Sequence, residues 1–82
     1  SSLFPNPAAD NTTVVFNMEA GAVATIDITD NTGRVVRNRG SVNLVPGENR
    51  IVLPLEGLAE GMYQVNLTTA TAARTLPLLI SK

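Results

Sequence analysis

The chain has no cysteine, no histidine and no tryptophan among its 82 residues. A chain without cysteine can form neither a disulfide nor a thiolate metal site. A chain without histidine lacks the usual general base of an enzyme and the commonest protein ligand for metals. We therefore expect a non-catalytic protein that carries no metal and no other cofactor.

Aromatic residues and net charge are also scarce. The aromatics are Phe4, Phe16 and Tyr63. We expect all three inside the protein, which leaves no platform for stacking nucleic-acid bases or sugar rings. Six basic and seven acidic residues give a formal net charge of −1, and this charge provides no field that would attract nucleic acid. We therefore predict no nucleic-acid partner.

Long apolar runs are missing as well, although hydrophobic residues make up 44% of the chain. A transmembrane helix needs about 20 consecutive apolar residues, and the apolar runs of this chain are much shorter. The N-terminus shows no secretory signal. If the protein is exported, we expect it to have been cut from a longer chain that carried such a signal.

Apolar residues alternate with other residues along most of the chain, which is typical of strands with one buried face. The alternation covers residues 14–18, 24–29, 50–55, 63–69 and 75–80, and shorter strand candidates lie at 34–38 and 42–45. The side chains predicted to point inward are Phe4, Phe16, Ile26, Ile28, Ile51, Leu53, Tyr63, Val65 and Leu67.

Short strands at this regular spacing, separated by turn residues, indicate an all-β protein. We predict that residues 1–82 form one domain, and strands spaced in this way favour a sandwich or a small barrel. The expected architecture is an antiparallel Greek-key β-sandwich of about seven strands. Exposed edge strands in so thin a sandwich also predict weak homodimers, formed by edge-strand pairing or by exchange of the last strand.

The sequence Asp30-Asn31-Thr32-Gly33 predicts a tight hairpin turn, because asparagine and glycine both tolerate positive φ. The same residues superficially match an aspartic-protease loop, but the turn is the better interpretation. Asp27 and Asp30 are too few to provide the roughly six to eight oxygen ligands that calcium requires. We interpret them as solvated charges at strand edges.

Three arginines, Arg34, Arg37 and Arg39, form a small basic cluster. It has the charge to bind phosphate or an anionic sugar, but charge that protects an edge strand from aggregation is the favoured interpretation. Two segments match the glycosylation sequon, Asn11-Thr12-Thr13 and Asn66-Leu67-Thr68. In a threonine-rich β-protein we expect such matches by chance.

Two motifs concern backbone geometry rather than chemistry. The prolines of Phe4-Pro5-Asn6-Pro7 predict an extended backbone followed by a turn, with Phe4 anchored in the core. In the segment from Leu58 through Gly61 to Tyr63, a tyrosine corner is predicted, in which the hydroxyl bonds to upstream backbone. Gly61 permits the sharp turn and Leu58 fills the core below it, whereas an ordinary cross-strand tyrosine is the alternative.

These segments together resemble the type A C-terminal sorting domain of the type IX secretion system of Gram-negative bacteria. The resemblance rests on the opening Leu3-Phe4-Pro5-Asn6-Pro7, the hairpin at 24–36, the segment 58–65 and the terminal residues 78–82. The sequence Leu76-Pro77-Leu78 departs from the family pattern. Because Pro77 cannot donate to a β-ladder, we expect this strand at a sheet edge or bulged.

The resemblance implies a non-catalytic immunoglobulin-like sandwich of about seven strands. It also implies that this domain is a signal that directs a cargo protein across the outer membrane. The implied partners are the outer-membrane translocon, a shuttle protein and a sortase that usually removes the domain. The implied location is the periplasm, in transit to the outer membrane and cell surface. The hypothesised recognition residues of the last strand are Leu76, Leu78, Leu79, Ile80 and Lys82.

A chain terminus is a feature that every cargo can present, and strand addition needs little side-chain specificity. The alternative for this strand is that it only completes the sandwich. The alternatives for the whole domain are a fibronectin-like or immunoglobulin-like spacer and an adhesion module that assembles by strand exchange. A stop codon directly after Lys82, with a signal peptide upstream, would favour the sorting domain.

Overall fold

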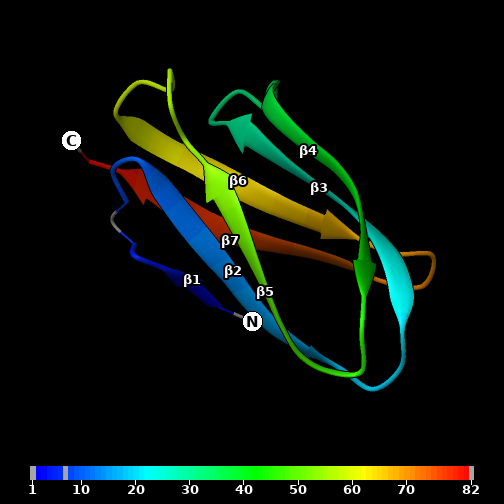
Figure 1. The fold of residues 1–82 in the computed structure, drawn as a ribbon. Coiled ribbons are helices and arrows are strands. Elements are labelled where there is room, and N and C mark those ends of the chain that lie inside the picture. Colours follow the sequence, from blue (N-terminus) through cyan, green and yellow to red (C-terminus); the bar gives the residue numbers. More distant parts are fainter. Residues whose placement is uncertain (1, 7, 82) are drawn as a thin grey trace.

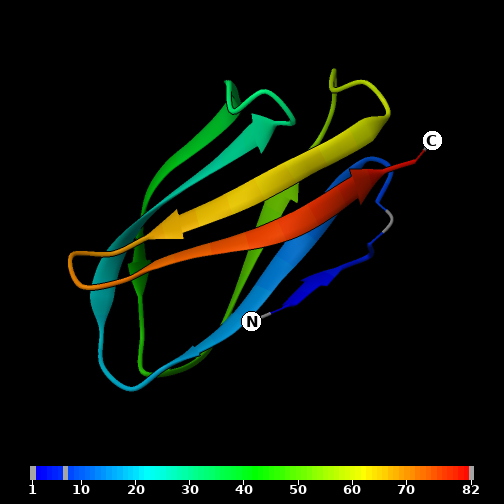
Figure 2. The same cartoon turned by 180° about the vertical axis from the view of Figure 1, so that it is seen from behind.

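The computed structural model describes residues 2–6 and 8–81. These residues form seven strands in two facing sheets (Figure 1, Figure 2). The strands are β1 (Ser2–Phe4), β2 (Asn11–Met18), β3 (Ala22–Asp30), β4 (Val35–Leu44), β5 (Gly47–Pro54), β6 (Gly61–Thr68) and β7 (Ala73–Ile80). All neighbouring strands pair antiparallel, so the predicted all-β sandwich is confirmed.

The smaller sheet has the strand order β1-β2-β5 and the larger sheet has the order β4-β3-β6-β7. The chain changes sheet between β2 and β3, between β4 and β5, and again between β5 and β6. This is an immunoglobulin-like connectivity in which the fourth strand lies beside the third. Each sheet therefore has two edge strands, and β7 occupies one edge of the larger sheet.

The two short strands expected at 34–38 and 42–45 are wrong, because β4 is one strand over Val35–Leu44. Its ladder with β3 contains two register shifts, one at Ile26/Asp27 and one at Ile28/Thr29. Gly40 also has a positive φ of 83°. Bulges of this kind interrupt the period-two alternation, so the sequence shows two fragments where the fold has one irregular edge strand.

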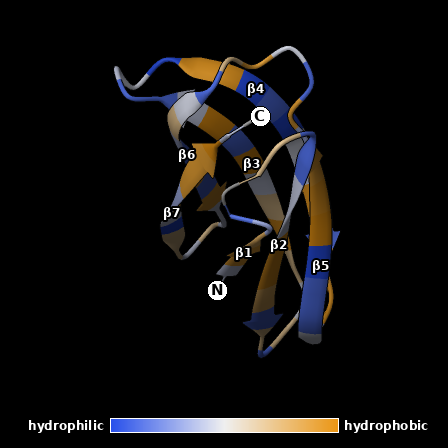
Figure 3. Ribbon diagram, turned by 90° about the vertical axis from the view of Figure 1, so that its left-hand side faces the viewer, coloured by the Kyte–Doolittle hydropathy of each residue, from blue (hydrophilic) through white to orange (hydrophobic). Residues whose placement is uncertain are grey.

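The core lies between the two sheets, and hydropathy alternates along most of the strands that contribute to it (Figure 3). The predicted inward residues that are buried are Phe16, Ile26, Ile28, Leu53, Val65 and Leu67. Ile51 and Tyr63 are partly buried and pack against that cluster. The last strand adds Leu78, 0% exposed, and Ile80, 1% exposed.

The expectation that Phe4 anchors the core is wrong, because its side chain is 46% exposed. In the β1–β2 register Leu3 lies opposite the buried Val14, whereas Phe4 lies opposite Thr13. Neighbouring side chains in a strand point to opposite faces, so Leu3 takes the inward position. Phe4 lies on the outer face, where the Arg50 guanidinium stands 5.8 Å from its ring centroid.

The segment before β6 forms a corner. The Tyr63 hydroxyl donates to the carbonyl oxygen of Ala59 at 2.7 Å, which is the geometry expected of a tyrosine corner. Leu58 is buried in the core, and Gly61 adopts a φ of 151° that side-chain-bearing residues rarely adopt.

The fold predicts a sharp difference between two neighbouring residues of β5. Leu53 is 1% exposed and Val52 is 57% exposed. Leu53→Ala should lower the free energy of unfolding by about 2–5 kcal/mol, because it leaves a cavity in the core. Val52→Ala is the control and should change it by less than about 0.5 kcal/mol. Urea unfolding measures both, and equal losses would contradict the assigned faces.

The corner predicts a second pair of stability changes. Tyr63→Phe should cost about 0.5–1.5 kcal/mol, since it keeps the ring but removes the bond to Ala59. Gly61→Val should cost more, because a branched side chain strains a positive φ. Thermal unfolding is the measurement. Two variants that melt with the parent would show that the corner contributes nothing to stability.

Candidate recognition site at the C-terminal strand

The carboxylates considered as calcium ligands each have hydrogen-bond partners within the protein. Asp27 accepts a bond from the Asn66 amide at 2.7 Å, within a polar row on the outer face of the larger sheet that also includes Thr75. No group of three or more acidic side chains able to hold a metal occurs in the described part of the chain.

Asp30 closes the turn that leads into β4. Its Oδ1 accepts bonds from the Thr32 hydroxyl at 2.5 Å, from the Thr32 amide at 2.9 Å and from the Arg34 amide at 3.1 Å. These bonds, first of all the one from the Thr32 hydroxyl, lower the pKa of the Asp30 carboxyl below its usual value. Gly33 completes the turn with a φ of 87°, so these residues serve backbone geometry.

The three arginines do not converge on one site. Arg34 pairs with Asp30 at 3.7 Å, and Arg39 is exposed on β4. Arg37 instead donates to the Pro54 carbonyl at 3.1 Å and to the Glu56 carbonyl. These bonds join the edge strand β4 to the end of β5 in the opposite sheet. Arg37 is therefore a link between the sheets rather than an anion ligand.

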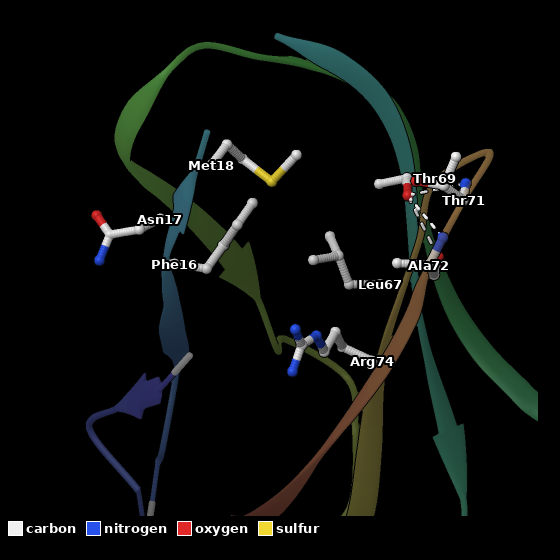
Figure 4. A pocket seen from close by; sticks show the side chains of 8 residues that line it. All are labelled: Phe16, Asn17, Met18, Leu67, Thr69, Thr71, Ala72 and Arg74. Carbon is white, nitrogen blue, oxygen red and sulfur yellow. Dashed lines mark hydrogen bonds between the residues drawn. The ribbon is translucent and has the colours of Figure 1, made fainter. Parts of the chain in front are cut away.

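A shallow cavity opens at one end of the sandwich, between β2 and the β6–β7 hairpin (Figure 4). Phe16, Met18 and Leu67 give it an apolar wall, and the Arg74 side chain extends along its rim. Its lining contains no carboxylate or other base beside a nucleophile. This arrangement has no group that could activate a reacting atom.

The hypothesised recognition residues divide between the two faces of β7. Leu78 and Ile80 are buried and Leu76 is partly buried against the core. Leu79 points to the outer face with 36% exposure, and its register partner Met62 on β6 is 54% exposed. The prediction that Lys82 contributes falls outside the described residues. Of the described set, Leu79 presents the most accessible apolar side chain.

The opening motif lies against this last strand. The Asn6 side chain donates to the Pro77 carbonyl at 3.1 Å and accepts from the Leu79 amide at 3.0 Å. Ala8, which is 2% exposed, follows with a parallel bridge to Ile80. The loop after β1 and the end of β7 accordingly lie side by side in both views (Figure 1, Figure 2). We call Asn6 and Ala8 the terminal clasp.

Sequence reasoning placed Asn6 in a rigid corner and missed its partner. Pro5 and Pro7 have no N–H to donate, so the amide of Asn6 is the side-chain group in this motif that can both donate and accept. An asparagine between two prolines therefore indicates that its side chain bonds to another segment of the chain. The sequence does not identify that segment. Pro77 lies in an edge strand, where its missing N–H is tolerated.

The family comparison fits this geometry. A family model described as a secretion system C-terminal sorting domain matches residues 2–81. A search of curated proteins finds no match. No helix long and apolar enough to cross a membrane is found among the described residues. The match runs from β1 to the residue after β7 and so includes both partners of the terminal clasp. The chain therefore belongs to the family of C-terminal sorting domains of the type IX secretion system.

Proposed function

We propose that the secretion machinery recognises this sorting domain through β7 and the surface next to it. A cargo protein joined to the domain would be carried from the periplasm across the outer membrane to the cell surface. The family match supports the export role in general. The proposal adds where the domain is recognised and which route the cargo takes.

The position of β7 is the observation that carries this proposal. The strand pairs along its length with β6 on one side and lies at the edge of the larger sheet. An edge strand presents main-chain groups to which a partner can add a strand, and main-chain bonds supply much of the affinity in such complexes. A machine that handles unrelated cargoes needs a feature of this kind, because it depends little on side-chain identity.

The outer face adds a side-chain feature next to the edge. Met62 and Leu79 are register partners and are both exposed. An exposed apolar pair beside a strand edge favours contact with another protein, since its burial removes apolar surface from water. The proposed contact surface therefore consists of the β7 edge together with Met62 and Leu79.

The proposed partners are an outer-membrane translocon, a shuttle protein that receives the domain and a sortase that separates it from the cargo. The fold supports removal of the domain as a unit, because its core is formed by its own two sheets. Cleavage before β1 would leave that core intact. The proposal assigns no catalytic role to the domain itself.

Export of a fused reporter tests the role of β7. Deleting residues 80–82 from a periplasmic reporter joined to this chain should abolish its appearance at the surface of a host with the secretion system. Because Ile80 is a core residue, circular dichroism must establish that the truncated domain is folded. Leu79→Asp is a second variant that leaves the core untouched, and we expect it also to block export.

Val52→Asp is the matched control, because Val52 is an exposed apolar residue on the smaller sheet. It should leave export unchanged. Folded domains that carry Leu79→Asp or the deletion and still deliver the reporter would refute recognition through β7. They would favour a β7 that only completes the sandwich.

A further inference from the structure

We propose that the terminal clasp closes the outer edge of β7 and must open before a partner strand can add along it. The inference rests on the proposed function, in which the machinery recognises β7. The partner would be an extended polypeptide segment that pairs through its main chain. In this proposal the side chain of Asn6 holds the clasp closed, and we call this its latch role. Asn6 itself is not proposed to contact the cargo protein.

The hydrogen bonds at the end of β7 carry the argument. In an antiparallel strand, alternate residues direct their N–H and C=O groups to opposite edges. On the edge away from β6, Asn6 takes the Pro77 carbonyl and the Leu79 amide. Ala8 donates to the Leu79 carbonyl at 2.8 Å and accepts from the Ser81 amide at 2.8 Å. Pro77 has no N–H to offer.

The clasp therefore saturates the outer edge of β7 from the Pro77 carbonyl to the Ser81 amide. A second strand cannot bond to these groups while the clasp is in place. By the same alternation, the outward groups of Thr75 lie beyond the reach of the two clasp residues. Thr75 directly follows Arg74, whose side chain lines the cavity (Figure 4). A partner strand that pairs along the whole of β7 therefore has to displace the clasp.

The clasp makes few contacts, so it can separate from β7 without unfolding the sandwich. Asn6 is exposed and holds β7 by two side-chain bonds, and Ala8 buries only a methyl group. The preceding segment is fixed, because the buried Thr12 donates its hydroxyl to the Pro5 carbonyl at 3.1 Å. A partner strand would replace each released bond with a main-chain bond of its own.

Hydrogen exchange tests whether Asn6 holds the edge. Asn6→Ala should raise amide exchange at Leu79 roughly tenfold, the effect of removing one side-chain hydrogen bond. The amides of Leu78 and Ile80 point to the β6 side and should keep the protection of the parent. Asn43→Ala is the control, because Asn43 is an exposed strand asparagine for which the described structure shows no side-chain hydrogen bond. Unchanged exchange at Leu79 would overturn the latch role.

A reversible lock tests whether the clasp must open. Ala8 and Ile80 are bridge partners, and neighbouring strands lie about 4.8 Å apart, within the separation that a disulfide spans. The chain has no other cysteine. We expect the double variant Ala8→Cys, Ile80→Cys, oxidised in the periplasm, to lose surface delivery of the reporter. The matched control is the same double variant with its two thiols kept reduced, which should regain delivery relative to the oxidised form. Ala8→Cys alone and Asn6→Ala should both be delivered.

The outcomes separate this inference from the proposed function. If Leu79→Asp blocks export but the disulfide-locked domain is delivered as well as its reduced form, the clasp does not need to open and the inference is overturned. If Leu79→Asp is also delivered, recognition through β7 fails as well. Loss of delivery confined to the oxidised double variant supports the inference, provided that mass spectrometry shows the disulfide has formed.

Discussion

The burial of one face of each sheet against the other is the constraint on which this structure depends. A chain of 82 residues has a thin core, so each strand must contribute to it. The last strand contributes Leu78 and Ile80, which are fully buried. β7, the strand proposed to be recognised by the secretion machinery, is therefore also part of the core. If the secretion machinery recognises β7 at the edge of the folded sheet, as proposed, export depends on the folded state of the domain.

The open edges of the two sheets set the second constraint, because unpaired strands attract other strands. Different features hinder the pairing of another strand at β1, at β4 and at β7. β1 is short, β4 is bulged and carries charged residues, and Arg37 ties β4 to the end of β5. At β7 the protection is a proline together with the terminal clasp. Among these three edge strands, β7 is closed at one end by bonds that a competing strand could replace.

Much of the fold could be predicted because alternation reports burial directly. The inward faces of β3, β5 and β6 followed from residues such as Ile26, Leu53 and Val65. The alternation was misleading at two places, the irregular strand β4 and Phe4 in β1. β4 appeared as two fragments because its register shifts break the period. Phe4 was assigned to the core on its size alone, but its position opposite Thr13 decides its face.

The candidate site was only half visible in the sequence, for a physical reason. Strand periodicity is a local property, so the terminal strand could be recognised from residues 75–80 alone. The terminal clasp is a contact between segments 73 residues apart. On the β7 side it uses only main-chain groups, which leave no trace in residue identity. A pattern of residue types can reveal that Asn6 is able to pair with a strand edge, but the topology decides which edge lies within reach.

Hydrogen bonds join the opening motif to the last strand, and neither of these segments carries a reactive group. Pro5 and Pro77 each remove a main-chain donor, and Asn6 supplies a donor and an acceptor that bond to β7. The opening motif and the last strand thus form one hydrogen-bonded unit at the edge of the larger sheet. The chemistry of this unit is hydrogen-bond exchange between strands. Such exchange is compatible with the proposed recognition of β7 through its main chain.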